Sequence, residues 1–174
     1  MGKIQEITDF IRDFNLLQET WIEEKDLQRT MRKLDERFRW TAKPVIRSKT
    51  KGRAAGGQLL GIKKNLNWGP VEEWEFGLVV RGRVAGEQVT LITVYNNVGV
   101  GKLKSSLEEL IEGIERRGDK ILIVGDWNAR IGEKQGRTDK HEDDKWHRNS
   151  EYKVLNWEGR RLLGMCQEIW DRLF

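Results

Sequence analysis

The residues of this sequence with the clearest chemical potential are Asp126 and Asn128, which follow a short apolar run. Four consecutive apolar residues, Ile121–Val124, predict a strand that is covered on both faces, because a half-exposed strand would alternate. Gly125 then allows backbone or ligand to come close. Residues two apart on an extended chain point the same way, so we expect the carboxylate and the amide side by side. A proton acceptor beside a neutral hydrogen-bond donor suits attack of water on a phosphate, although an Asx turn that closes a core strand explains the same residues.

Two further candidates stand at the ends of predicted strands. Glu19 follows the apolar piece Phe14–Leu17, and Tyr95 ends the alternating strand Val89–Tyr95. A carboxylate at a strand end suits Mg²⁺, which prefers oxygen ligands and keeps several waters. Taken alone, the first residue is a surface glutamate before a turn and the second a packed tyrosine with a solvated hydroxyl.

Composition sets the class of protein. At 174 residues, with 34% charged and 37% hydrophobic residues, the chain has the length of one domain and enough apolar residues for a core. No apolar run approaches the ~18 residues of a membrane span, and no signal-peptide region opens the chain. The single cysteine, Cys166, cannot form an internal disulfide. We therefore expect an intracellular protein without a membrane segment, and the nucleus is a compatible compartment.

Positive charge is concentrated in one block. The stretch Arg37–Val71 holds nine Lys or Arg residues and no Asp or Glu, within a net charge of +4 for the whole chain. Such a block suits a polyanion such as a nucleic-acid backbone, and equally the solvated outer faces of a hairpin. The two histidines, His141 and His147, have no metal-site spacing and are interpreted as solvated loop residues.

Periodicity predicts alternating helices and strands. The two hairpins are expected to turn at the loop 48–57 and at Ala85-Gly86, and Phe38 and Trp40 should face inward. We predict strands over 14–17, 37–40, 59–64, 74–80, 89–95 and 121–124, and helices over 4–14, 23–36 and 103–114. The last of these helices is expected to have a capping box of Ser106 and Glu109 and to end at 116–118. A C-terminal helix should follow, with a buried stripe of Leu162, Cys166, Ile169 and Leu173.

Several segments, in order, resemble one family. G-D-W-N-A-R-I-G is similar to the G-D-F-N motif of the endonuclease/exonuclease/phosphatase superfamily, in the form carried by endonuclease domains of LINE-type (non-LTR) retrotransposons. L-Q-E-T, K-G-R-A-A-G-G-Q-L-L-G-I-K-K, V-Y-N and N-W-E-G resemble other segments of that family. The resemblance implies an α/β fold of the DNase I-like, four-layer kind: a two-sheet β-sandwich flanked by helices.

The resemblance also implies a function. It predicts a metal-dependent endonuclease that nicks DNA, with Mg²⁺ or Mn²⁺ held by Glu19. Asp126 would orient or deprotonate the attacking water, and Asn128 and Tyr95 would contact the phosphate. The family's loop asparagine corresponds to Asn96 or Asn97.

The chain departs from the family pattern at both ends. Family members begin with a strand whose Asn shares the metal, and they finish with strands that carry an Asp and then an Asp-His pair. We therefore expect residues 1–174 to form a single, incomplete domain with impaired activity, and the reverse transcriptase domain of full-length relatives is absent. Two alternatives stay open: a non-catalytic remnant that binds nucleic acid through the basic block, and an enzyme that acts on another phosphodiester, such as a phospholipid headgroup or an inositol phosphate.

Overall fold

The computed structural model describes residues 13–45, 56–134 and 150–173. The chain forms two compact units. The larger unit comprises Met1–Tyr95 and Ile111–Gly125, and the smaller unit comprises Asn96–Leu110 and Asp126–Phe174. Each is described by itself below.

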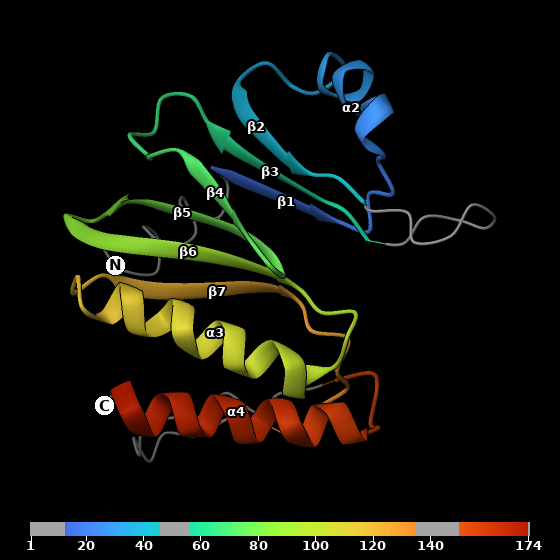
Figure 1. Ribbon diagram of the computed structural model, residues 1–174, viewed down its shortest axis with the longest axis vertical. Helices are drawn as coiled ribbons and strands as arrows, with labels where there is room; N and C mark the ends of the chain where they lie inside the picture. Colours follow the sequence, from blue (N-terminus) through green and yellow to red (C-terminus); the bar gives the residue numbers. More distant parts are fainter. Residues whose placement is uncertain (1–12, 46–55, 135–149, 174) are drawn as a thin grey trace. The chain divides into compact units, whose positions relative to one another are not determined.

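The first sheet of the larger unit has three antiparallel strands in the order β1-β3-β2 (Figure 1). They are β1 (Phe14–Gln18), β2 (Phe38–Lys43) and β3 (Gln58–Lys63). Trp40 pairs with Gly61, and a Cβ on that glycine would lie 2.7 Å from the indole ring. The glycine therefore makes room for the tryptophan on the outer side of this sheet.

The second sheet has four strands in the order β4-β5-β6-β7. They are β4 (Val71–Trp74), β5 (Gly77–Val84), β6 (Glu87–Tyr95) and β7 (Lys120–Asp126). The β5–β6 hairpin turns at Ala85 and Gly86, whose φ angles of 51° and 86° match a two-residue turn with both central residues left-handed. This confirms the predicted turn.

The two sheets pack face to face around an apolar core. Leu60 and Ile62 of β3 contact the second sheet's buried face, where Leu78, Val80 and Leu91 are at most 3% exposed. Burying a side chain of this size contributes roughly 1.5–3 kcal/mol, so this interface is the main source of stability in the larger unit. The predicted two-sheet sandwich is confirmed.

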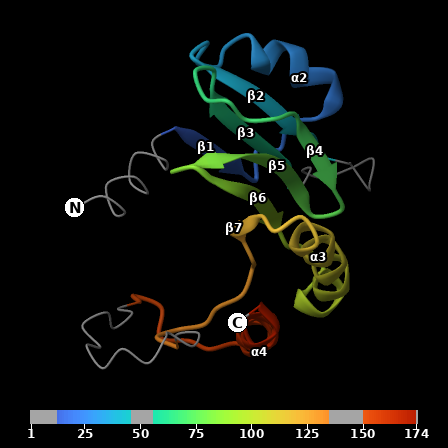
Figure 2. The same cartoon turned by 90° about the vertical axis from the view of Figure 1, so that its left-hand side faces the viewer.

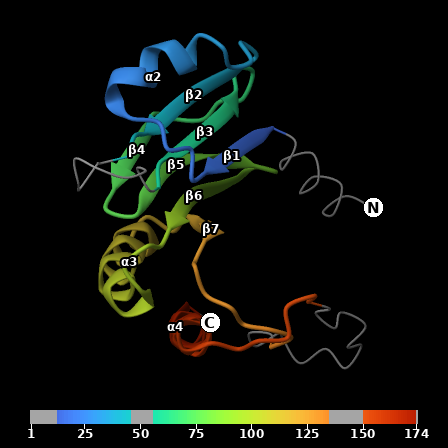
Figure 3. The same ribbon diagram turned by 90° about the vertical axis from the view of Figure 1, so that its right-hand side faces the viewer.

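Helices lie outside the sheets. In the larger unit, α2 (Glu24–Met31) lies beyond β2 (Figure 2, Figure 3). The last turn of α3 (Val100–Glu115) belongs to the same unit as β7. Phe38 and Trp40 do not lie between the sheets, because their cross-strand partners are Lys63 and Gly61, on the face opposite to Leu60 and Ile62. Trp40 Nε1 donates to Asp35 O. The smaller unit holds the start of α3 and α4 (Trp157–Leu173). None of the described helices is long and apolar enough to cross a membrane.

Three predicted boundaries are wrong. The expected strand 74–80 is two strands with a turn at Glu75–Phe76, because Phe76 O accepts hydrogen bonds from Gln58 Nε2 (3.0 Å) and Tyr95 N (2.8 Å), long-range contacts that no local pattern encodes. The helix expected at 23–36 ends at Met31. α3 begins at Val100, so Ser106 and Glu109 lie inside the helix and form no capping box.

Two burial predictions are also wrong. β7 forms as predicted, but Leu122 is 37% exposed, since β7 is the outermost strand in the order of its sheet. In α4, Cys166 is exposed, and Met165 takes the buried position with Leu162. Of the helix expected at 4–14, Phe14 begins β1, and the other residues lie almost wholly outside the described part of the chain.

Candidate functional site

Glu19 and Tyr95 meet in the larger unit. The Tyr95 hydroxyl donates a 2.9 Å hydrogen bond to Glu19 Oε1, although the two residues are 76 positions apart. Glu19 directly follows β1 and Tyr95 ends β6, so one comes from each sheet. The glutamate side chain is exposed, and a carboxylate in that position can accept a further ligand through its second oxygen.

The backbone around Glu19 is strained. Glu19 and Trp21 have φ angles of 52° and 51°, a left-handed conformation that costs a non-glycine residue roughly 1–2 kcal/mol. Gly56 and Gly57 oppose this segment: Trp21 N donates to Gly56 O at 3.0 Å, and a Cβ on Gly57 would lie 2.6 Å from Thr20 Oγ1. Among the described residues, the buried Thr20 hydroxyl has no hydrogen-bond partner. Strain and an unsatisfied buried group of this kind concentrate at functional sites.

A buried polar network fixes the two strand ends. Gln58 Oε1 accepts a hydrogen bond from Thr93 Oγ1 (2.7 Å), and Thr93 Oγ1 accepts one from Leu78 N (2.8 Å). Beside it, Gln18 Nε2 donates to Val94 O at 2.5 Å. These bonds tie β1 and β3 to β5 and β6 one residue before Glu19 and Tyr95, so the pair is positioned by the core and not by loops.

The smaller unit holds the other two predicted residues. Asp126 Oδ1 accepts a 2.9 Å hydrogen bond from Asn128 N, and Asn128 has a φ angle of 47°. The chain therefore turns after β7 instead of extending, and the Asx-turn interpretation is confirmed as local geometry. Gly125 has its predicted role, because a Cβ there would lie 1.9 Å from Val94 O of β6.

The structure distinguishes the two neighbouring asparagines. Asn96 is 1% exposed, its Nδ2 donates to Trp127 O (2.9 Å), and its Oδ1 accepts from Val98 N (3.2 Å) and Gly99 N (3.0 Å). Its own carbonyl accepts the Asn128 side-chain amide at 2.6 Å. Asn96 therefore holds the Asp126 turn in place, whereas Asn97 is exposed.

Asp126 and Asn128 line a cleft of about 530 Å³ in the smaller unit. Three other lining residues were missed by the sequence reasoning: Arg130, Tyr152 and Asn156. The Arg130 guanidinium lies 5.9 Å from the centre of the Tyr152 ring, and Tyr152 is 69% exposed. Asn156 Oδ1 accepts hydrogen bonds from Arg130 N (3.1 Å) and Gly159 N (2.7 Å), which joins this wall to the start of α4. No spacing rule marks these residues, because the bridge between Ile131 and Leu155 that aligns them is tertiary.

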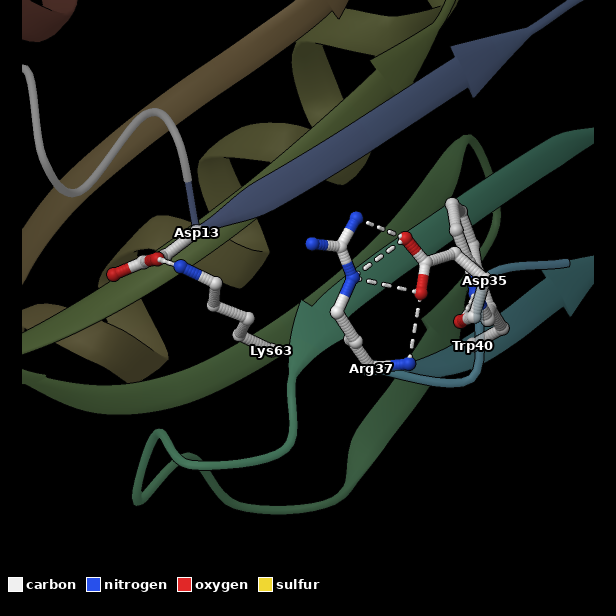
Figure 4. A network of polar contacts seen from close by, with 5 residues as sticks. All are labelled: Asp13, Asp35, Arg37, Trp40 and Lys63. Atoms are coloured by element: carbon white, nitrogen blue, oxygen red, sulfur yellow. Dashed lines mark hydrogen bonds and ion pairs between the residues drawn. The ribbon is translucent and has the colours of Figure 1, made fainter.

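Four of the five basic-block residues that the structure describes make contacts within the protein. Figure 4 shows Arg37 paired with Asp35 (Nη2 to Oδ2, 2.6 Å) and Lys63 with Asp13 (2.5 Å). Arg39 Nη2 donates to Trp68 O and Gly69 O, and Lys43 Nζ donates to Trp74 O. Burial lowers the pKa of Lys43. The other members, except Lys64, lie outside the described residues, as do His141, His147 and most of the loop 48–57.

The side chains that could bind a metal ion here are carboxylates. Within the described ranges, no group of three or more His, Cys, Asp or Glu side chains gathers. The Glu19 cluster offers one carboxylate and the Asp126 cluster another. Mg²⁺ is often held by one or two carboxylates together with water and substrate phosphates, so each carboxylate by itself fits a loosely held ion of that kind and not an all-protein cage.

Comparison with known proteins gives distant structural similarities. No protein-family model matches the sequence, and no curated protein matches it. The structure is similar to truncated Caenorhabditis elegans TDP2, with 14% identity and a TM-score of 0.48 over 72% of this chain and 53% of that chain. It is similar to the human Nocturnin catalytic domain with bound sulfate, with 16% identity and a TM-score of 0.45 over 73% of this chain and 55% of that chain. It is also similar to D. rerio TDP2 complexed with single-strand DNA product, with 15% identity and a TM-score of 0.40 over 74% of this chain and 53% of that chain. The protein thus spans about half the length of these chains, and the similarities are too low to assign a family.

Proposed function

We propose that this protein is a metal-dependent phosphodiesterase of the endonuclease/exonuclease/phosphatase superfamily, related to the DNA-nicking endonucleases of LINE-type retrotransposons. The observation that carries the proposal is the hydrogen bond between Tyr95 and Glu19. The family resemblance assigns both residues to one site, and they come from different sheets. A structural role alone gives no reason for a glutamate to sit there in a strained, left-handed conformation.

Each residue has a proposed task. Glu19 would hold Mg²⁺ or Mn²⁺, which when bound supplies positive charge to the phosphate. Tyr95 orients the Glu19 carboxylate and can donate its hydroxyl to a phosphate oxygen instead. Asp126 has one oxygen committed to Asn128 N, and its other oxygen, which has no partner among the described residues, can accept a proton from water.

Asn128 has a proposed task that is mainly indirect. One N–H of its amide is committed to Asn96 O, which fixes the turn that carries Asp126. Its second N–H can reach a phosphate oxygen. Its effect on the reaction therefore combines positioning of the carboxylate with a direct contact.

DNA is the proposed substrate. Arg130 would contact a backbone phosphate in the Asp126 cleft, because a guanidinium presents several N–H donors to phosphate oxygens. Tyr152, exposed on the same rim, offers a ring on which a base can stack. The described basic block is less suited to this role, since Arg37, Arg39, Lys43 and Lys63 already have partners.

We expect weak activity from this chain alone. Its described residues contribute a single carboxylate to the proposed metal and no histidine to the phosphate. Losing one contact of this kind typically costs ten- to a thousandfold in rate.

A plasmid-nicking assay in Mg²⁺ tests the proposal. The wild-type protein should convert supercoiled plasmid to the open-circular form, and Asp126→Ala should lower the rate at least about a hundredfold. Asp26→Ala, which removes an exposed carboxylate on α2, is the matched control and should leave the rate unchanged. Equal rates in the wild type and Asp126→Ala, or no Mg²⁺ dependence, would remove this chemistry from the protein.

A further inference from the structure

A second cleft, of about 480 Å³, lies on the outer face of the second sheet in the larger unit. Three arginines line it: Arg81 and Arg83 from β5, and Arg117 just after α3. They lie outside the basic block Arg37–Val71 that the composition singled out. Neither Glu19 nor Tyr95 is among the residues that line it, so within the larger unit this cleft is a different feature from that pair.

A fully buried carboxylate holds two of these arginines in place. The Asp119 side chain has 0% exposure and accepts hydrogen bonds from Arg81 Nε (2.7 Å), Arg81 Nη2 (2.6 Å) and Thr90 Oγ1 (2.9 Å). Arg117 Nε lies 3.5 Å from Asp119 Oδ2. Nearly half of each of these arginine side chains stays exposed, at 47% and 46%. The contacts with Asp119 already restrict these two side chains, so a ligand that binds them loses less side-chain conformational entropy.

Donors remain available after these contacts. A guanidinium carries five N–H groups, and Asp119 takes those of Arg81 Nε and Nη2. Arg83 uses Nε on Gln88 Oε1 (2.7 Å). Among the described residues, Arg81 Nη1 and the terminal nitrogens of Arg83 and Arg117 have no partner, so several charged donors border one cleft.

We propose that this cleft binds a nucleotide unit through its phosphate. Fixed guanidinium groups match phosphate oxygens in geometry and charge. Among the described residues, Glu72 of β4 is the one acidic side chain that lines the cleft, and its carboxylate can accept hydrogen bonds from a sugar hydroxyl or a base amino group. The volume is in the range of small-molecule sites. The same phosphate chemistry occurs in a free nucleotide and in one unit of a nucleic-acid strand.

Binding assays with two probes test the inference and separate the two sources. The probes are AMP, followed by calorimetry, and a fluorescein-labelled single-stranded 12-mer, followed by anisotropy. Arg83→Gln and Arg117→Gln should each weaken the binding of at least one probe about tenfold, since each removes charge-assisted hydrogen bonds to the phosphate. Arg116→Gln is the matched control, because Arg116 is the neighbouring residue, is 79% exposed and does not line the cleft.

The outcomes are distinct. Weakened AMP binding indicates a free nucleotide, and weakened binding of the 12-mer alone indicates a strand. Absence of measurable binding of both probes, or an equal effect of Arg116→Gln, overturns the inference. Neither cleft variant changes Glu19, Tyr95 or a residue of the Asp126 cleft, so a failure of the phosphodiesterase proposal leaves the AMP result unaffected, and the reverse.

Discussion

The side-chain amide of Asn128 donates a 2.6 Å hydrogen bond to the main-chain carbonyl of Asn96. The two residues are 32 positions apart, and the bond closes the turn in which Asp126 accepts Asn128 N. The turn thus depends on Asn128 twice, through its side chain and through its left-handed backbone.

Substitutions of Asn128 separate these two contributions. Asn128→Gly keeps the backbone preference and loses only the amide, so the free energy of unfolding should fall by roughly 0.5–1.5 kcal/mol. Asn128→Ala should cost about 1 kcal/mol more, because alanine disfavours a φ of 47°. Urea unfolding measures both. Identical losses in the two variants would show that the backbone conformation carries no cost here.

Substitutions of Glu19 and Tyr95 separate the metal ligand from its orienting partner. Glu19→Gln should lower the nicking rate at least about tenfold and raise the Mg²⁺ concentration for half-maximal rate, because the proposed ligand charge is gone. Tyr95→Phe should lower the rate with a smaller change in Mg²⁺ dependence. The Mg²⁺ titration of each variant checks this. If Glu19→Gln matches Glu24→Gln, an exposed glutamate on α2, Glu19 holds no metal.

Asp119 makes stability depend on pH in the acid range. The Arg81 guanidinium holds the pKa of Asp119 below its ordinary value. Because the folded pKa is lower than the unfolded one, the pair stabilises the fold fully above the ordinary aspartate pKa of about 3.9, and this contribution disappears as the pH falls below it. Asp119→Asn should therefore unfold more easily at pH 7 and should lose less stability than the wild type as the pH falls below about 4. Urea melts at several pH values measure the difference, with Asp26→Asn as the exposed control.

Two glycines should respond oppositely to alanine. At Gly125 a Cβ would lie 1.9 Å from Val94 O, a contact with backbone that cannot move aside cheaply. Gly125→Ala should destabilise by about 3 kcal/mol or more, or prevent folding. Gly113, inside α3, meets nothing within 4 Å, so Gly113→Ala should stabilise by roughly 0.5–1 kcal/mol. Thermal unfolding checks both, and a neutral Gly125→Ala would contradict the close approach of β6 and β7.

Tyr152 should affect binding of the substrate more than chemistry. Tyr152→Ala removes the exposed ring beside Arg130, and we expect the KM for a single-stranded oligonucleotide to rise about fivefold or more with kcat nearly unchanged. Steady-state kinetics measure the split. Trp157→Ala, which removes another exposed aromatic residue stacked near an arginine but outside the Asp126 cleft, serves as the control.

Much of the local structure followed from the sequence. The alternation and turn residues of Ala85-Gly86 predicted the β5–β6 hairpin, and the apolar run before Gly125 predicted β7, because such patterns reflect the two-residue period of a strand and the freedom of glycine. The spacing of Leu103, Leu107, Ile111 and Ile114 predicted α3, and these side chains are all buried. Asp126 and Asn128 were selected by type and spacing, and Glu19 and Tyr95 by their resemblance to family motifs.

Tertiary contacts decided the rest. The turn at Glu75–Phe76 and the burial of Asn96 depend on partners 18 and 32 residues away. The exposure of Leu122 depends on the place of β7 at the edge of its sheet. The two clefts with their arginines were equally hidden, since Arg81 meets Asp119 and Arg130 meets Tyr152 only after the chain has folded. The sequence determines which side chains are available and which secondary structure each segment favours. Which of them meet is set by the burial of apolar faces, a non-directional force summed over the whole chain.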